Sequence, residues 1–382
     1  MLATRLSTWV RAGAAACLLF AGLAHAEVKI GSVLSVTGPA AFLGSPEKKA
    51  LEMYVDLINS KGGVLGQKIR LVLYDDGGKA DQARTFATRL VEDDKVVAVV
   101  GGSVTGTSLA MMPVFEEAKV PFISISGAVQ IVDPVRKFTF KPPQTDLMAC
   151  QKIFVDMKKR NITNIAMIHG TDGFAMSMRG SCKSVAGSYG VKIAHEESYG
   201  PTDADVTAQL TNIRNVAGIQ AVLSPGIGSG PAVVARNYRQ LGITAPLYLS
   251  HGAASPGFVQ LAGAAANGIR MPGPALLVAR SLPDSDPQKK VLVDFTNYFE
   301  PKAGEPVSAF AGYAYDGLYI LVDAISRAKG LDSQKIRDEI EKTKGFVGTV
   351  GHVTFSPTDH LGVTLEAFKM LEIRDGKWTL FE

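Results

Sequence analysis

The 382-residue sequence is poor in cysteine and has almost no excess charge of either sign. It contains three cysteines, and its formal net charge is +4 at pH 7. A balance this small argues against nucleic acid and against a membrane surface as partners. Only Cys150 and Cys182 lie beyond the N-terminal segment, and no pair of histidines lies near them, so a zinc site is not favoured.

Long apolar runs are also missing. No stretch reaches the roughly 18 apolar residues that a membrane-spanning helix needs. The N-terminus carries a shorter run at 12–23, preceded by Arg5 and Arg11 and followed by an Ala-His-Ala sequence that ends at residue 26. This pattern predicts a secretory signal peptide over 1–26, cleaved at its end, and a periplasmic location. Removing two arginines and no acid lowers the net charge from +4 to +2.

Signatures of catalysis are absent as well. No G-x-S-x-G sequence occurs, and the six histidines lie in no motif with a serine or a cysteine. Neither the Gly-Lys-Ser/Thr phosphate loop nor the dinucleotide-binding glycine pattern is present. The sequence therefore predicts no enzyme, no catalytic residue, no cofactor and no bound metal.

The clearest local pattern lies between residues 96 and 126. An apolar run at 96–100 is typical of a buried strand. Two glycines end that run, apolar residues then recur at helical spacing from Leu109 to Ala118, and a second apolar run occupies 122–125. Strand, loop, helix and strand in this order predict one right-handed βαβ unit of a parallel sheet.

The loop before that helix is rich in glycine and hydroxyl groups, Ser103 and Thr105 among them. A helix N-terminus presents unpaired backbone N–H groups and the positive end of the helix dipole. Such a loop suits a small anion, for example a carboxylate, without any charged side chain. The alternative is that these hydroxyls only cap the helix.

Strands and helices alternate along the rest of the chain. Strands are predicted at 28–33 and 69–74, with a helix at 46–59 between them, and the same order restarts with a helix at 146–160. This alternation predicts an α/β protein with two doubly wound domains. No long linker separates them, so short crossings must join them, the first near Lys141-Pro-Pro-Gln.

An oxidising compartment permits a disulfide between Cys150 and Cys182. The sequence places both cysteines on helices that flank the same predicted strand, which favours the bond. Two separately buried thiols remain the alternative.

Four segments together resemble a known family. They are KIGSVLSVTGPAAFLG, INSKGGVLGQKIRLVLYDD, DKVVAVVGGSVTGTSLAMMPVFEEAKVPFIS and GYAYDGLYILVDA. In this order and spacing the chain resembles the periplasmic substrate-binding proteins of ABC importers, in the type I branch that includes the leucine/isoleucine/valine-binding proteins. The resemblance covers essentially all of the chain after the signal peptide.

The resemblance implies two α/β lobes joined by three hinge crossings, with a ligand bound in the cleft between them. It implies that 27–143 plus 276–350 form lobe 1 and that 144–275 plus 351–382 form lobe 2. Closure of the lobes around the ligand would be a hinge motion. The implied partners are a small-molecule ligand and a membrane permease, and the expected state is a monomer.

The resemblance also implies site residues. The family's carboxylate-binding serine corresponds to Thr105, and the next contact segment corresponds to Ser126, Gly127 and Ala128. The aromatic residue that covers the ligand from lobe 2 corresponds to Phe174. Where relatives carry an acid for the ligand ammonium, this sequence has Ser-His-Gly-Ala-Ala, with His251 as the polar candidate.

Ala128 and the missing acid indicate that the carboxylate side of the site is kept and the ammonium side lost, because a buried unpaired ammonium is costly. Phe42 would add an aromatic ring at the cleft mouth. Gly226 and Ile227 are weaker candidates, and Ser103 joins the anion loop.

The pattern FLGSPEK with SHGAAS is similar to relatives that bind aromatic carboxylates. We therefore rank an aromatic or other hydrophobic carboxylate first as the ligand. A branched-chain or other hydrophobic amino acid is the alternative. A ligand-sensing module of the same fold is a further alternative for the role of the protein.

Overall fold

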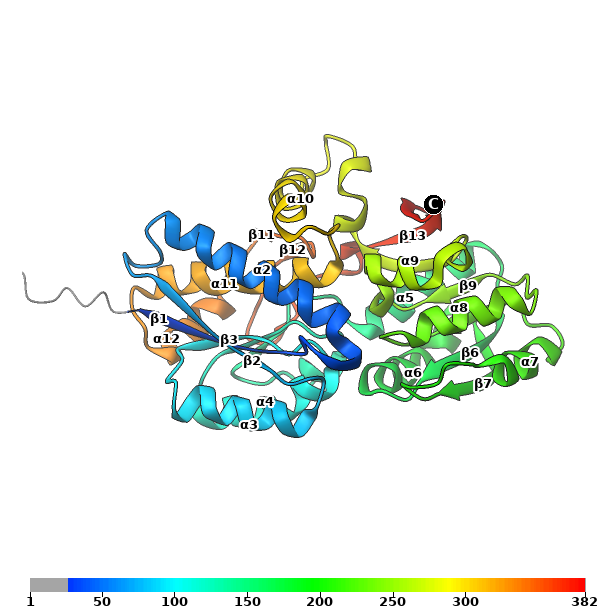
Figure 1. Ribbon diagram of the computed structural model, residues 1–382, viewed down its shortest axis with the longest axis horizontal. Coiled ribbons are helices and arrows are strands. Elements are labelled where there is room, and N and C mark those ends of the chain that lie inside the picture. The colour runs from blue at the N-terminus through cyan, green and yellow to red at the C-terminus, as the bar shows by residue number, and fades with distance from the viewer. Residues whose placement is uncertain (1–26, 382) are drawn as a thin grey trace, which may run out of the picture.

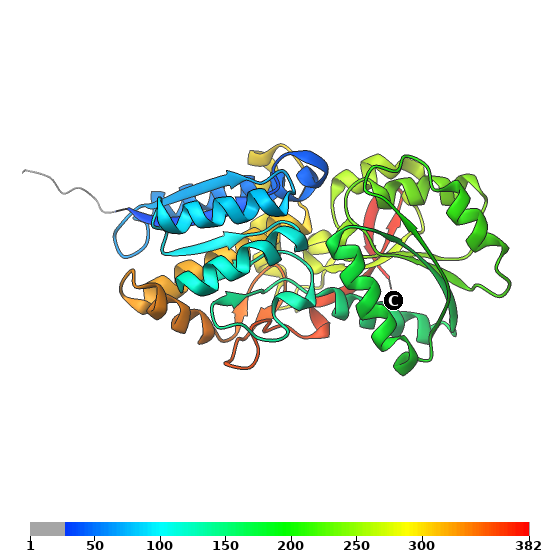
Figure 2. The same cartoon turned by 90° about the horizontal axis from the view of Figure 1, so that it is seen from below.

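The computed structural model describes residues 27–381. The predicted signal peptide and Cys17 therefore lie outside the described residues. The described chain forms two lobes, each built on a mainly parallel sheet with helices on its faces (Figures 1 and 2). The α/β class and the two-lobe architecture expected from the sequence are confirmed.

The first sheet has the strand order β2-β1-β3-β4-β5, and all of its pairs are parallel. Helices α2 and α11 lie on one side of this sheet and α3 and α4 on the other (Figure 1). The elements of this lobe are β1 (Val28–Leu34), α2 (Ala41–Ser60), β2 (Ile69–Asp75), α3 (Ala80–Glu92), β3 (Ala98–Gly101), α4 (Thr105–Ala118), β4 (Phe122–Ser124), β5 (Thr139–Phe140), α10 (Lys289–Ala303), α11 (Ala309–Ala328), α12 (Ser333–Glu341), β11 (Phe346–Val347) and β12 (His352–Val353).

The strands of this sheet send alternate side chains into two separate cores. Ile30 and Val100 pack on the side of α2 and α11, whereas Val33 and Val99 pack on the side of α3 and α4. Because both faces are covered, β3 at the centre of the sheet is a continuous apolar run without polar alternation. The apolar run at 96–100, which predicted the central strand, therefore belongs to a strand that is buried on both faces.

The second sheet has the order β14-β13-β10-β9-β8-β6-β7. Its pairs are parallel except at the β10–β13 and β13–β14 edges, which are antiparallel. The elements of this lobe are α5 (Asp146–Lys159), β6 (Asn164–Gly170), α6 (Gly173–Val185), β7 (Lys192–Tyr199), α7 (Thr207–Asn215), β8 (Ala221–Ser224), α8 (Gly230–Gln240), β9 (Leu247–Leu249), α9 (Pro256–Ala262), β10 (Arg270–Pro274), β13 (Phe368–Arg374) and β14 (Lys377–Leu380).

The chain passes between the two sheets three times, at 141–145, 275–288 and 354–367. Two of these crossings are tied together. The Gln144 side-chain amide donates to the Val350 carbonyl at 2.8 Å and to the Ala367 carbonyl at 3.0 Å, and the Lys141 backbone N–H donates to the His360 carbonyl at 2.9 Å. The residue limits of the two lobes inferred from the sequence stay a prediction.

Some predicted boundaries were wrong. Helix α2 begins at Ala41 and not at Pro46, because the 3-10 turn Gly38–Ala40 runs directly into it. Phe42 is therefore helical. In the second lobe, β13 begins at Phe368, directly after the 3-10 turn Leu365–Ala367.

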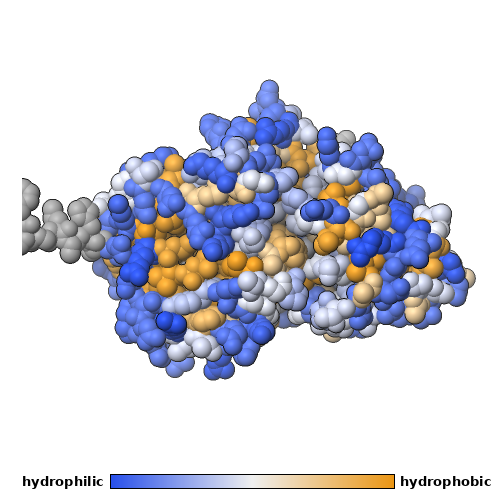
Figure 3. All heavy atoms as spheres, viewed as in Figure 1, coloured by the Kyte–Doolittle hydropathy of each residue, from blue (hydrophilic) through white to orange (hydrophobic). Residues whose placement is uncertain are grey.

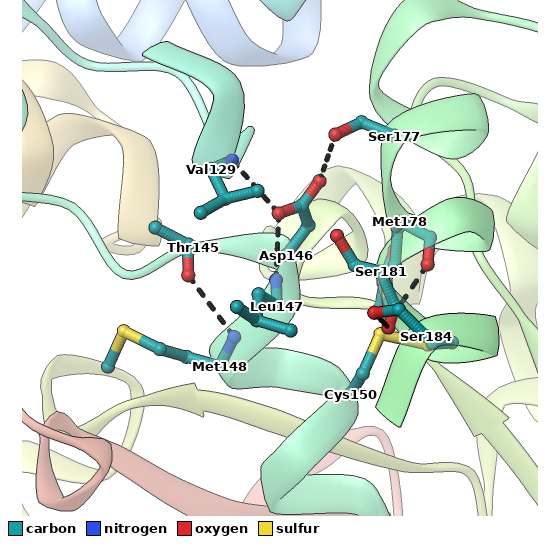
Figure 4. Close-up of a disulfide and its surroundings, with 12 residues drawn as sticks. Val129, Thr145, Asp146, Leu147, Met148, Cys150, Ser177, Met178, Ser181 and Ser184 are labelled. Atoms are coloured by element: carbon teal, nitrogen blue, oxygen red, sulfur yellow. Dashed lines mark hydrogen bonds between the residues drawn. A yellow bond between two sulfur atoms is a disulfide. The ribbon is translucent and has the colours of Figure 1, made fainter. Parts of the chain in front are cut away.

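The structure joins Cys150 of α5 to Cys182 of α6 by a disulfide, and both side chains are fully buried (Figure 4). The same two helices are tied at the end nearest the first crossing. The Ser177 hydroxyl of α6 donates to the Asp146 carboxylate of α5, and the Val129 backbone N–H donates to the same carboxylate at 2.9 Å. Two cross-links therefore fix α6 against α5.

Polar side chains cover most of the face shown in Figure 3, and apolar side chains gather mainly over the lobe that contains α2. Among residues 27–381, no helix has both the length and the apolar character needed to cross a membrane.

Reducing this disulfide should lower the free energy of unfolding. A bond that closes a loop with a sequence separation of 32 residues restricts the unfolded chain by about 3–4 kcal/mol. Urea denaturation with and without dithiothreitol measures the difference. The double variant Cys150→Ala/Cys182→Ala is the matched control, and reductant should leave its midpoint unchanged. Equal midpoints for the native chain in both conditions would contradict the prediction.

Candidate functional site

The carboxyl ends of the parallel strands in the two lobes face each other across a cleft, the edge at which α/β sheets bind ligands. Loops after β3 and β4 meet loops after β6, β8 and β9. They form a cavity whose atom-free space, including the part that opens to solvent, is about 330 Å³. It is lined by Leu43, Ser103, Val104, Thr105, Ile125, Ser126, Gly127, Phe174, Ile227, His251, Gly252, Phe310 and Tyr313.

One end of the cavity is formed by the N-terminus of α4. The N-cap residue Val104 offers no side-chain hydrogen bond, and the Thr107 hydroxyl donates backward to the Val104 carbonyl at 3.0 Å. The Thr105 hydroxyl is buried without a partner. The hydroxyls of this loop therefore do not cap the helix, and the helix dipole and Thr105 are directed at the cavity.

A cluster of serines holds this loop in place. Ser108, Ser124 and Ser126 have their hydroxyl oxygens within 3.0–3.2 Å of one another. Gly102 has φ +78°, and a Cβ at that position would lie 2.1 Å from the Ser108 hydroxyl oxygen. Glycine is thus required where β3 turns into α4, both for its backbone conformation and for space.

The opposite wall comes from the second lobe and is aromatic. The rings of Phe174 and His251 lie nearly perpendicular to each other, with their centroids 5.2 Å apart. Both ring nitrogens of His251 lack a partner. Burial, followed by the nearby Lys141 charge, lowers the pKa of His251 to about 3, so the imidazole is neutral at pH 7. The acid that would pair with an ammonium is missing from the lining of the cavity.

Seven of the residues inferred from the sequence line the cavity: Ser103, Thr105, Ser126, Gly127, Phe174, Ile227 and His251. Three lie elsewhere. The Ala128 side chain is fully buried in the core beneath α4. Phe42 packs edge-on against Phe310, with ring centroids 5.9 Å apart, because the early start of α2 turns it onto α11. Gly226 lies behind Ile227, where its backbone pairs with the Ser250 hydroxyl.

Sequence patterns missed Tyr313 and Glu47. Tyr313 lines the cavity from α11, and its buried hydroxyl has no partner. Burial raises its pKa above the usual range of tyrosine. Glu47 is a fully buried carboxyl of α2 directly behind Ser103. An acid at an otherwise apolar helix position was the available signal.

The cavity continues outward into a second hollow. Val104, Thr105, Phe174 and Ile227 line both. Part of the outer wall is Tyr199, whose buried hydroxyl also lacks a partner. Among residues 27–381, no group of three or more histidines, cysteines or acids is arranged to hold a metal ion.

Residues 27–377 match the sequence profile of the family described as "Periplasmic binding protein". The chain is 25% identical to a Leu/Ile/Val-binding protein homolog 3 of Brucella melitensis, covering 95% of this chain and 96% of the relative. It is 26% identical to the leucine-, isoleucine-, valine-, threonine- and alanine-binding protein of Pseudomonas aeruginosa, covering 92% and 91%.

Solved structures have the same two-lobe arrangement. An extracellular ligand-binding receptor from Rhodopseudomonas palustris is 26% identical with a TM-score of 0.87, covering 93% of this chain and 100% of that one. The branched-chain amino acid transporter substrate-binding protein LivJ from Streptococcus pneumoniae, solved with isoleucine, is 25% identical with a TM-score of 0.82, covering 92% and 98%.

A side chain at Gly127 should prevent the lobes from meeting. Its Cβ would lie 2.6 Å from a Phe174 ring carbon and 3.2 Å from His251 Nε2 across the cleft. Overpacking costs about 1–3 kcal/mol, so Gly127→Ala should weaken binding of a cleft ligand by about fivefold or more. Isothermal titration calorimetry measures this. Gly180→Ala on α6, where a Cβ meets nothing within 4 Å, is the matched control. Equal affinities would show that this contact does not limit closure.

Proposed function

The chain belongs to the periplasmic binding protein family, and from that premise we propose that it captures a small apolar carboxylate between its lobes and presents it to the permease of an ABC importer. The observation that carries the proposal is the α4 N-terminus. Its dipole and the unpartnered Thr105 hydroxyl face an otherwise apolar cavity. The family consists of binding proteins, and the protein is not an enzyme.

The same premise supports a closing motion about the three crossings. We take 27–143 plus 276–350 and 144–275 plus 351–382 as the two bodies that move. The anion donors belong to the first body and the aromatic cover to the second. Closing them around a ligand removes its apolar surface from water, which contributes about 25 cal/mol per Å². Donors of the first body orient the carboxylate.

The names of the relatives favour a branched-chain amino acid as the carboxylate. Two of the proteins described above are named for leucine, isoleucine and valine, and the LivJ structure contains isoleucine. This reading has more support from comparison than an aromatic carboxylate, for which none of the four relatives described above is named. An amino acid would place its ammonium near His251 or a backbone carbonyl.

The chemistry of the wall favours a carboxylate without an amine. Among residues 27–381, no aspartate or glutamate lines the inner cavity; Asp172 lines only the outer hollow, and His251 is neutral. An ammonium enclosed there would lose its water without gaining a carboxylate partner, which is costly. Phe174, Phe310 and Tyr313 supply aromatic surface for a ring or a branched chain.

A thermal-shift screen separates the two ligand classes. Leucine, isoleucine and valine form one set, and 4-methylpentanoate and benzoate, which lack the amine, form the other. A ligand at 100 times its Kd stabilises the fold by about 2.7 kcal/mol, so Tm should rise. A rise with the first set alone identifies an amino-acid site, and a rise with the second alone identifies loss of ammonium binding. No rise with any compound would contradict the proposed ligand class.

Thr105→Ala should weaken binding of the ligand so identified. Losing one hydrogen bond to a charged group costs about 1.5–3 kcal/mol, which is about tenfold to a hundredfold in Kd. Thr105→Ser keeps the hydroxyl and should remain close to the native affinity. If Thr105→Ala binds as tightly as the native chain, Thr105 does not contact the ligand.

A further inference from the structure

A buried carboxyl lies directly behind the anion end of the cavity. Glu47 projects from α2 and is fully buried. One of its oxygens is hydrogen-bonded to the Ser103 hydroxyl, and the other, Oε1, has no partner. Ser103 itself lines the cavity. Glu47 can therefore act on a ligand only through Ser103.

The hydrogen-bond capacity of Ser103 is limited. Its hydroxyl oxygen accepts the Ser35 backbone N–H at 2.9 Å. A hydroxyl has one hydrogen to donate and two lone pairs to accept with. If Glu47 is ionised, the Ser103 hydrogen must point at Glu47, and Ser103 offers the ligand no donor. If Glu47 is protonated, Glu47 donates to Ser103, and the Ser103 hydrogen is free to point into the cavity.

The groups around Glu47 favour its neutral form. Asp76, just after β2, is the nearest other acid; it accepts the Ser35 hydroxyl at 2.7 Å, and its second carboxylate oxygen is unpartnered. Tyr313 approaches from α11, and the neutral His251 faces the cavity from the other lobe. Within the described chain, residues 27–381, no cation is paired with Glu47. Burial first, and the Asp76 charge as well, raise the pKa of Glu47 to about 8, against the opposing effect of the Ser103 hydrogen bond.

We propose that Glu47 is the positioning residue of the carboxylate site: protonated Glu47 donates to Ser103 and turns the Ser103 hydroxyl toward the ligand carboxylate. The inference rests on the proposed carboxylate-binding function and adds to it a requirement for one proton. A carboxylate bound beside an ionised Glu47 would lack the hydrogen bond from Ser103 and would be repelled by the negative charge of Glu47. Binding and protonation of Glu47 are therefore coupled, and each favours the other.

The sign of the pH effect follows from this coupling. The bound carboxylate raises the pKa of Glu47 further, because it favours the neutral form. Affinity is then constant well below the pKa of about 8 in the free protein. Above that pH, each pH unit weakens binding toward a limit of about tenfold, since one proton must be taken up.

The test measures Kd for 4-methylpentanoate from pH 6 to 9.5 by calorimetry. The native chain should bind with constant affinity up to about pH 7.5 and then lose affinity by up to about tenfold per pH unit. Glu47→Gln should bind like the native chain at pH 6 and show no loss at pH 9, because its amide donates to Ser103 without titrating. Glu117→Gln, on the exposed surface of α4, is the matched control and should keep the native profile.

Ser103→Ala should bind more weakly at pH 6 and lose most of the pH dependence, which a purely structural role for Glu47 does not predict.

If Glu47→Gln folds poorly, proton uptake by the native chain still tests the inference. Calorimetry at pH 8.5 in buffers of different ionisation enthalpy should show uptake of up to about one proton on binding. If only leucine binds, the ratio of native to Glu47→Gln affinity is followed with pH, so that titration of the ligand amine cancels.

Two outcomes overturn the inference. One is a native profile that stays flat to pH 9.5 without proton uptake, and the other is a slope that persists in Glu47→Gln. Failure of the proposed function looks different, because then neither leucine nor 4-methylpentanoate binds the native chain even at pH 6, and the role of Glu47 falls with it.

Discussion

In the proposed function, an anion enclosed between the two lobes must exchange its water for fixed donors. Among residues 27–381, no cationic side chain lines the cavity to help meet that requirement. The turn from β3 into α4 meets it with backbone and hydroxyl groups. Gly102 allows the chain to turn sharply, and the linked serines around Ser108 hold the turn in one shape. Because these groups are set before the ligand arrives, little orientational freedom remains to be lost on binding.

The two lobes have different roles in the proposed recognition. The donors for a carboxylate lie on the first lobe, and the aromatic side chains of Phe174 and His251, which would exclude water, lie on the second. Neither lobe alone surrounds a ligand. The tie from Gln144 to Val350 and Ala367 links two of the three crossings. In the proposed closing motion these two crossings would move together, and the donors and the aromatic cover would reach the ligand in one step.

Much of the fold followed from local pattern, and part of the candidate site did too. The apolar run and glycine loop before Thr105 form a βαβ unit whose element order can be read from thirty or so consecutive residues. Tyr313 and Glu47 could not be found in this way. They lie on α11 and α2, far from the loop in sequence. Only the packing of both helices on one face of the sheet brings Tyr313 to the cavity and Glu47 to the back of Ser103. Ala128 and Phe42 were inferred as site residues from their positions in the family resemblance, but neither side chain reaches the cavity. Local backbone structure, such as the early start of α2, decides where a side chain points, and the resemblance does not predict it.

The order of the elements along the chain affects when the newly synthesised polypeptide can fold. The second sheet includes β13 and β14, from the last residues of the chain, and the first core needs α11 packed on α2 across some 250 residues of intervening sequence. A chain that emerges N-terminus first cannot complete the first core until α11 has been made, nor the second sheet until β13 and β14 have been made. Contacts so distant in sequence also form slowly, because each requires the closure of a long loop. The interleaved connectivity therefore delays the folding of both lobes until the C-terminal part of the chain has been synthesised.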